Sequence, residues 1–321
     1  MATLAALITL AGIFTIPHPT VTIKSSTTRA TIDWIGAFLI TAALLCLTFA
    51  LTEGNVVRWS TPWIPVLIVV SVFLILLFLL WQHRLETQAI RAPLMKISIF
   101  RNREFSASIL TMVVLFASFN GYLVYATYFY QEYQSSSPLQ TTLRFIPTGV
   151  TGVTMAIAVS YFLLRIPAYF ILLLGSICVS THSLLFAIPI PPDTTYFAYG
   201  LWAMMLATLG ADTTIPSLSL FVSHALAQED QAMGGALLNA AMQFGKVFGL
   251  AIATTTQTIV MARARGVPVE NVGQVHPRES SSLAGLRAAN WLNFAFGLCA
   301  FCVVAVSFRG SGIVGKAKGA S

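Results

Sequence analysis

The sequence predicts an all-α integral membrane protein, a polytopic helical bundle of about nine spans. Of its 321 residues, 56% are apolar and only 9% are charged, whereas an ordinary soluble domain carries about 25% charge. The mean hydropathy is +0.79. The charged residues leave long uncharged intervals, and about 20 apolar residues suffice to cross the hydrocarbon core of a bilayer. This composition excludes a large soluble catalytic domain.

The spans follow in order from the intervals between charged residues. Seven intervals without a charged residue are each long enough to hold a span. Two further apolar stretches are interrupted by one charge each, Asp212 in the first and Lys246 in the second. Proline-rich turns at 135–138 and 188–192 separate antiparallel neighbours. The expected spans lie near residues 2–17, 34–52, 62–82, 106–128, 142–163, 168–188, 197–222, 233–260 and 288–308.

The first apolar segment has neither the basic n-region nor the small-residue cleavage site of a signal peptide. We therefore expect a retained span or the remnant of one. Basic residues orient the bundle, because cytoplasmic loops carry an excess of Lys and Arg. Placing the C-terminus in the cytoplasm puts eleven basic residues on that side and five on the other. An odd number of spans then leaves the N-terminus outside.

Two charged residues fall at the depth of the hydrocarbon core. Asp212 and Lys246 lie near the middle of their expected spans, where a charge costs at least ~2.5 kcal/mol and indicates function. If they face each other, they form either an ion pair that opens when Asp212 binds a proton or substrate, or a static pair that fixes helix register. Pro216 follows Asp212 and removes a helical hydrogen bond, so we expect a local break or kink there.

Aromatic and amide side chains add to this pattern in the span at 106–128. Asn120, Tyr122 and Tyr125 lie deep in the span, where they could line a cavity for an aromatic or apolar solute. Tyr128 and Tyr130 follow at its end, a position that is typical of the interfacial aromatic belt.

Small residues predict how one span packs. Gly245 and Gly249 form a GxxxG pattern, which favours close approach of a neighbouring helix, and Lys246 lies beside that face.

No motif predicts a metal site, a cofactor or an enzyme activity. The cysteines lie inside apolar stretches, and Cys299-Ala-Phe-Cys302 has no second pair of ligands. The segment 310–316 has the spacing of a phosphate loop, but Ala317 replaces the Ser or Thr that would hold Mg²⁺. The basic residues act as topology signals, so nucleic acid is not an expected partner.

Four stretches of the chain carry a family resemblance. They are Asp33-Trp-Ile-Gly-Ala-Phe-Leu39, the segment 92–103, the segment 137–147, and Gly210-Ala-Asp-Thr-Thr-Ile-Pro216 running on to 231–239. Together they resemble the fourteen-span drug/proton antiporter branch of the major facilitator superfamily, in its fungal multidrug-efflux form. The family's motifs in its N-terminal half are absent, so the resemblance is to the C-terminal part only.

The resemblance implies the C-terminal portion of the major facilitator fold and a division of the chain into four parts. Residues 1–31 correspond to a remnant of a preceding transmembrane helix and a cytoplasmic linker. Residues 32–104 correspond to a transmembrane hairpin and a basic cytoplasmic loop. Residues 105–308 correspond to the C-terminal six-helix transporter domain, and residues 309–321 to a cytoplasmic tail.

The resemblance also implies proton-coupled efflux of amphipathic organic compounds, such as drugs, toxins or secondary metabolites, through a central cavity. The expected partners are membrane lipid, protons and a small organic substrate, and the plasma membrane is favoured over the vacuole. The positions at which the resemblance points to proton coupling or substrate contact are Asn120, Arg144, Asp212, Gln243 and Lys246, with Arg144 alternatively at the outer headgroups.

A second interpretation is a membrane protein without transport activity of its own. Because the motifs of the N-terminal half are absent, the chain would be a truncated product or a half-transporter that needs a partner chain. The missing N-terminal half is then the expected partner.

Overall fold

The computed structural model describes residues 33–57, 59, 61–88, 93–163 and 165–309. Within these ranges no strand occurs and eight helices are long and apolar enough to cross a membrane, which confirms the predicted all-α membrane class. The expected span near 2–17 lies outside the described residues. The helices are α2 (Trp34–Val57), α3 (Trp63–Gln88), α4 (Arg103–Tyr128), α5 (Pro138–Leu163), α6 (Ala168–Ala187), α7 (Tyr196–Ala225), α8 (Gln231–Arg265) and α9 (Ser280–Ser307).

Short helical segments join some of these helices. A 3-10 helix, η1 (Ile97–Arg101), precedes α4, and a π-helical turn, η2 (Phe129–Tyr133), extends α4 toward α5. Two further 3-10 turns, η3 (Gln228–Asp230) and η4 (Val269–Asn271), lie before and after α8.

Several helices extend beyond their predicted limits, among them α2 to Val57 and α3 to Gln88. α8 continues past 260 to Arg265, because basic side chains are accepted in a last helical turn, and Gly266 at φ +68° then ends the helix. α9 begins at Ser280 rather than 288 and contains Arg287, whose Nη2 donates to the carbonyl oxygen of Ile190 at 2.7 Å. A charged residue limits the apolar window, but it does not end the helix.

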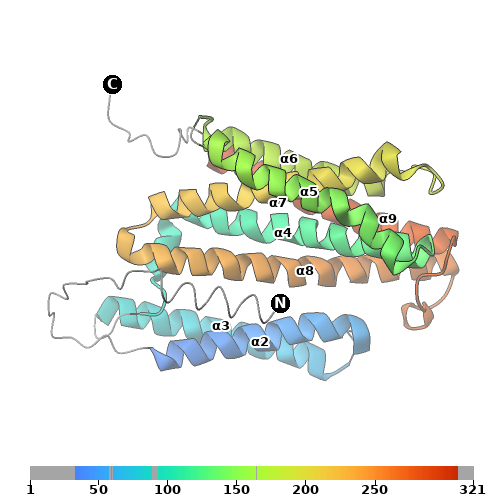
Figure 1. Cartoon of the computed structure of the whole chain (residues 1–321). Helices are drawn as coiled ribbons and strands as arrows, with labels where there is room; N and C mark the ends of the chain where they lie inside the picture. The colour runs from blue at the N-terminus through green and yellow to red at the C-terminus, as the bar shows by residue number, and fades with distance from the viewer. Residues whose placement is uncertain (1–32, 58, 60, 89–92, 164, 310–321) are drawn as a thin grey trace, which may run out of the picture. The chain divides into compact units, whose positions relative to one another are not determined.

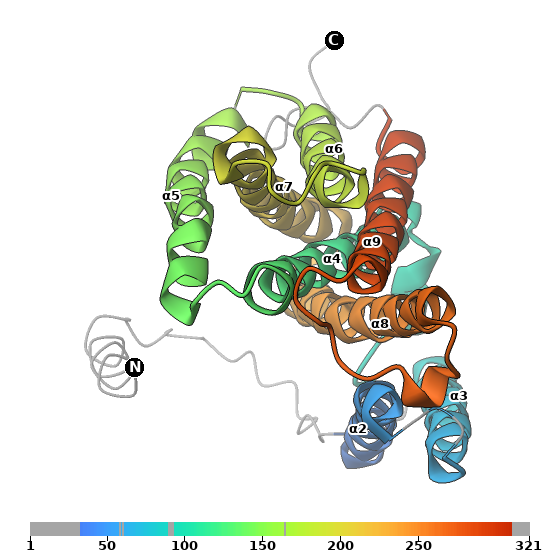
Figure 2. The same ribbon diagram turned by 90° about the vertical axis from the view of Figure 1, so that its right-hand side faces the viewer.

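The helices α4–α9 pack in two layers. In the first layer α5, α7, α4 and α8 are neighbours in that order, and α6 and α9 form a second layer against α7, α4 and α8. Figure 1 shows these helices running alongside one another, and Figure 2 shows α5 and α8 at opposite edges of the row. Each helix of the row therefore keeps part of its surface free of the second layer.

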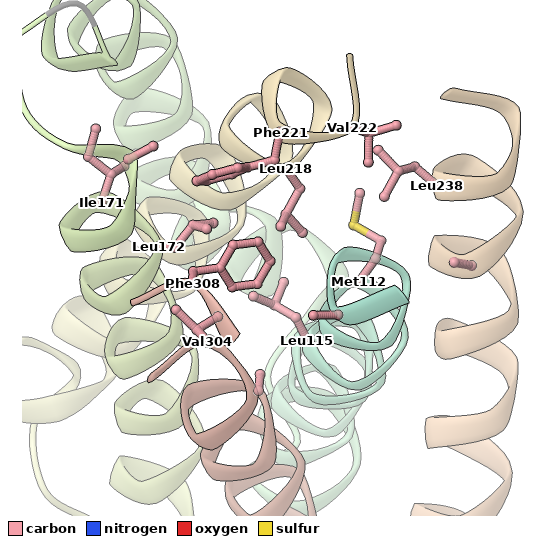
Figure 3. Packing of buried hydrophobic residues seen from close by; sticks show 14 of the residues in the cluster. Met112, Leu115, Ile171, Leu172, Leu218, Phe221, Val222, Leu238, Val304 and Phe308 are labelled. Carbon is pink, nitrogen blue, oxygen red and sulfur yellow. The ribbon is translucent and has the colours of Figure 1, made fainter. Parts of the chain in front are cut away.

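Two buried clusters hold these helices together. The first is mainly aliphatic and draws on α4, α6, α7, α8 and the end of α9 (Figure 3). Within it the rings of Phe221 and Phe308 lie with their centroids 4.9 Å apart. The second cluster is rich in aromatic residues and includes Tyr122, Tyr125, Phe129, Tyr130, Phe186 and Tyr199.

The hairpin of α2 and α3 is tied at its start by a buried carboxylate. Asp33, 6% exposed, accepts hydrogen bonds from the amide of Gly36 at 2.9 Å, from Trp81 Nε1 at 3.0 Å and from Gln82 Nε2 at 2.7 Å. The Oε1 atom of Gln82 in turn accepts from the amide of Met95 at 3.1 Å. The network joins both ends of the hairpin to the loop that precedes η1.

Glycine residues set the distance between α8 and α4. A Cβ atom on Gly249 would lie 2.5 Å from the Cα atom of Ala117, and one on Gly245 would lie 2.9 Å from the Cα atom of Val113. The GxxxG face therefore packs directly on the α4 backbone. Lys246 lies beside this contact, as its position in the sequence predicts.

Candidate functional site

Asp212 lies in the middle of α7 at the seam with α5. Its Oδ2 atom would lie 3.1 Å from a Cβ atom on Gly152, so the carboxylate fits where α5 has no side chain. The residue is half-buried, and within the described residues its carboxylate has neither an ion pair nor a hydrogen bond. An unpaired carboxylate at this depth needs water, a proton or a partner outside these helices.

Lys246 lies near the middle of α8 at the seam with α4. Its Nζ atom is 5.5 Å from the centroid of the Phe116 ring, a cation–π contact. One turn along α4 from Phe116 lies Asn120, which is half-buried, and one turn before Lys246 on α8 lies Gln243, which is exposed. The side chains of Lys246, Asn120 and Gln243 make no hydrogen bond within the part of the chain that the structure describes.

Asp212 and Lys246 do not pair with each other in this conformation. Among the described residues no ion pair joins them, because Asp212 contacts the α5 side of α7 whereas Lys246 points to Phe116 of α4. Neither the opening pair nor the static pair is therefore present. The two charges lie at two different seams of the same row of helices.

A break or a kink of α7 was expected at Pro216, and a break is not found. The helix runs without interruption from Tyr196 to Ala225 with Pro216 inside it. Hydroxyl groups around the proline bond to the helix itself: Thr214 Oγ1 donates to the carbonyl oxygen of Gly210 at 2.8 Å, and Ser217 Oγ donates to that of Thr213 at 2.7 Å. These bonds keep the surrounding turns closed while one amide donor is missing.

Tyr125 was expected to line an open cavity, but it does not. It is fully buried between α4 and α8, where its hydroxyl donates to Thr254 Oγ1 at 3.2 Å. Tyr130 does not belong to an interfacial belt either, since it is 2% exposed inside the aromatic cluster, whereas Tyr128 is 40% exposed. The rotation of α4 about its axis decides these positions.

Arg144 lies at one end of the bundle, where η2 leads into α5, and not beside Asp212. Its Nη1 atom donates to Gln134 Oε1 at 2.8 Å and to Ser136 Oγ at 3.1 Å. Of the two positions considered for Arg144, the end of the bundle is the one observed. We call this end the Arg144 end.

Ion pairs order the connecting segments outside the spans. Lys96 Nζ lies 2.9 Å from Glu229 Oε1 and 2.9 Å from Asp230 Oδ1, and these contacts, with Asp230 first, raise the pKa of Lys96. Arg265 pairs with Glu279, which lowers the pKa of that carboxyl to about 2. The second pair closes the long α8–α9 loop.

Tyr122 does not line an open cavity either, because it is fully buried in a polar group between α4, α6 and α9. The other members of this group, His182 and Asn293, were not singled out from the sequence. His182 is fully buried, and its ring centroid lies 4.3 Å from that of Tyr122. His182 Nε2, the Tyr122 hydroxyl and both amide atoms of Asn293 lack a hydrogen-bond partner within the described residues. The sequence feature that could have indicated this group is the pair Asn290 and Asn293, which lie three residues apart in the apolar run of α9.

The chain is similar to curated fungal transporters. It is 24% identical over 308 residues to an uncharacterized MFS-type transporter of Schizosaccharomyces pombe, across 96% of this chain and 55% of that protein. It is 25% identical over 300 residues to MFS-type transporter 1 of Pyricularia oryzae, across 89% and 48% of the two chains. It is 24% identical over 273 residues to the efflux pump terG of Aspergillus terreus, across 85% and 48%. No protein-family model matches the chain.

These similarities confirm the resemblance to the major facilitator superfamily and its fungal efflux branch. Together with the apolar helices, they identify an integral, multi-pass membrane protein. The relatives are named as transporters and efflux pumps, not as enzymes. The chain spans about half the length of the curated relatives it matches.

Proposed function

We propose that this chain forms one wall of the transport path of an efflux transporter that exports amphipathic organic compounds in exchange for protons. The observation that carries the proposal is Asp212, a carboxylate in the middle of a membrane span that has no partner among the described residues. A carboxylate that must be either hydrated or protonated at this depth is suited to proton coupling.

The polar residues of the neighbouring seam support the same function. Lys246, Asn120 and Gln243 present hydrogen-bonding groups without protein partners at half-buried or exposed positions. Lipid cannot satisfy such groups, which favours a face that meets water, substrate or a second set of helices. Membrane transporters bind their substrates near the midplane between two halves, so we assign this face to the substrate path.

A half-transporter that needs a partner chain is the second candidate function. The chain spans about half the length of its relatives, and one side of the row α5, α7, α4 and α8 is not covered by α6 or α9. In this interpretation the chain alone is inactive in transport, and an N-terminal half supplies the other wall.

We further propose a plasma-membrane location and a cytoplasmic C-terminus. The distribution of eleven basic residues against five supports this orientation. It places the Lys96 loop in the cytoplasm and the Arg144 end outside.

The test is export of a cationic amphipathic dye, rhodamine 6G, under an imposed pH gradient, from proteoliposomes that contain this chain together with the N-terminal half of a fungal relative. We expect Asp212→Asn to abolish the part of the export rate that depends on the gradient, because an amide cannot take up the transported proton. Glu104→Gln is the control, since Glu104 lies exposed in the first turn of α4 and its loss should leave the pH dependence unchanged. An unaltered pH dependence in Asp212→Asn would refute proton coupling at this residue.

The length of the native protein separates the two candidates. Because the chain supplies one wall in both, neither candidate expects export by the chain alone, and both expect export when the N-terminal half of a fungal relative is reconstituted with it. An immunoblot of the C-terminally tagged native protein measures that length. A species well above 34.7 kDa indicates that the chain acts within a longer protein, and a species near that mass indicates a separate half.

A further inference from the structure

A cavity of about 470 Å³ lies at the Arg144 end. Its wall comes from segments far apart in the sequence: η2 with the turn after it, the start of α5, the α6–α7 loop with the start of α7, and the α8–α9 loop. The volume falls in the range of roughly 300–1,000 Å³ that small-molecule pockets occupy. The lining residues that matter here are Tyr130, Gln134, Arg144, Asp193, Tyr196 and Arg278.

The guanidinium of Arg144 is held in place before any ligand arrives. Its Nη1 atom is fixed by Gln134 and Ser136 at 2.8 and 3.1 Å, and its Cζ atom lies 4.6 Å from the centroid of the Tyr130 ring. The backbone is fixed as well, since the hydroxyl of Tyr196 donates to the Arg144 carbonyl oxygen at 2.6 Å. The Nε and Nη2 donors have no protein acceptor within the described residues, which leaves one edge of the planar fork for a carboxylate.

A second cation lines the same cavity. The amide of Arg278 donates to the carbonyl oxygen of Tyr133 at 3.1 Å, so its backbone belongs to the cavity wall. Within the described residues neither Arg144 nor Arg278 pairs with a carboxylate, although exposed Asp193 also lines the cavity. Lys96 and Arg265, by contrast, are both paired. The cavity therefore holds an excess of positive charge.

Two tyrosine rings form an aromatic wall of the cavity. The rings of Tyr130 and Tyr196 lie with their centroids 6.2 Å apart. Tyr130 is 2% exposed, and its buried hydroxyl lies against Gly200 of α7. The wall therefore offers a ligand an aromatic surface rather than this hydroxyl.

We propose that this cavity binds a small aromatic carboxylate, whose anionic group meets the free edge of Arg144 and the charge of Arg278 and whose ring packs against Tyr196. The volume exceeds what an inorganic anion requires, and the tyrosine rings favour an aromatic body. The site lies at the end of the bundle, away from Asp212, and its ligand binds at equilibrium without transport. Failure of this inference therefore leaves the proposed efflux function untouched, and the reverse also holds.

The test is equilibrium dialysis of the purified full chain in detergent micelles with 1-naphthoate. The neutral isostere 1-naphthamide, inorganic phosphate and micelles doped with phosphatidylglycerol serve as comparison ligands. We expect 1-naphthoate to bind roughly tenfold or more tightly than 1-naphthamide, as charge-assisted hydrogen bonds are worth about 1.5–3 kcal/mol. Phosphate and the anionic lipid should not displace it.

Variants locate the site. Arg144→Gln should weaken 1-naphthoate binding roughly tenfold or more. Arg165→Gln should leave 1-naphthoate binding unchanged, because Arg165 lies beyond the other end of α5. It is a matched control, since Arg165 also makes a cation–π contact, 4.3 Å from the centroid of the Tyr161 ring. If Arg144→Gln does not fold, Arg278→Gln in the exposed loop replaces it, with a smaller expected loss.

Three outcomes would overturn the proposal. They are equal affinity for the acid and its amide, displacement by phosphate or anionic lipid, and equal effects of the Arg144 and Arg165 substitutions. The first comparison uses the unmutated chain, so it stands whether or not the variants fold.

Discussion

Replacing Gly249 by alanine should force apart the seam between α4 and α8. An ideal Cβ atom at this position would lie 2.5 Å from the Cα atom of Ala117 and 2.7 Å from its carbonyl oxygen. Carbon atoms pack best at roughly 3.5–4.0 Å, so the overlap is about 1 Å or more. Because the obstacle is largely backbone, no side-chain rotation relieves it, and the helices must separate.

The size of the effect follows from two opposing terms. A glycine-to-alanine change inside a helix gains about 1 kcal/mol from propensity, whereas overpacking costs about 1–3 kcal/mol. Gly149 of α5 provides the control, because nothing lies within 4 Å of its ideal Cβ position. Since both variants share the propensity gain, the difference in their free energies of unfolding isolates the clash, and we expect about 1–3 kcal/mol.

The assay is reversible unfolding in mixed micelles with increasing sodium dodecyl sulfate, followed by helical circular dichroism. We expect Gly149→Ala to be as stable as the unmutated chain or slightly more so, and Gly249→Ala to be the less stable of the two. If the two variants unfold with the same free energy, α8 does not approach α4 as closely as described. The assignment of Lys246 to that seam would then fail with it.

The remaining predictions concern two of the polar networks outside the bundle core. Asp33→Ala should destabilise the α2–α3 hairpin by about 3 kcal/mol, because it leaves the buried donors of Trp81 and Gln82 without an acceptor. Faster amide hydrogen exchange confined to α2 and α3 would show this destabilisation, and an unchanged exchange rate would contradict it. Glu279 has a pKa lowered to about 2 by Arg265, so its pairing stabilises the fold fully above the unfolded pKa of about 4.3 and progressively less as pH falls toward 2. The thermal midpoint of the unmutated chain should therefore fall more between pH 6 and pH 3 than that of Glu279→Gln, and equal falls would refute the pairing.

Several features of this protein could be predicted from single residues and their immediate neighbours. Each of the eight described spans overlaps its predicted interval, because the cost of a charge in hydrocarbon is a local property that any short window reveals. The GxxxG face at Gly245 and Gly249 follows for the same reason, since close packing needs only small residues at helical spacing. The helix ends at Arg265 and Ser280 did not follow, because a charged side chain can reach solvent or a carbonyl from inside a helix.

Which side chains contact each other could not be predicted from single residues and their immediate neighbours. The sequence places Asp212 and Lys246 at the same depth but says nothing about the angle from which each leaves its helix. In apolar spans nearly every face is hydrophobic, so periodicity does not show which face meets which neighbour. The tertiary structure decides that Asp212 contacts α5 and Lys246 contacts Phe116 of α4, and that Tyr125 is buried.

The sequence by itself determined the membrane class, the order of the described spans and the presence of two charges at bilayer depth. Each of these depends on transfer free energies that belong to individual residues. Only the tertiary structure joined Arg144 with Arg278, which come from different loops and line one cavity. Such a site depends on how helices cross and where loops return, and these are set by the packing of the whole bundle rather than by any segment of the chain.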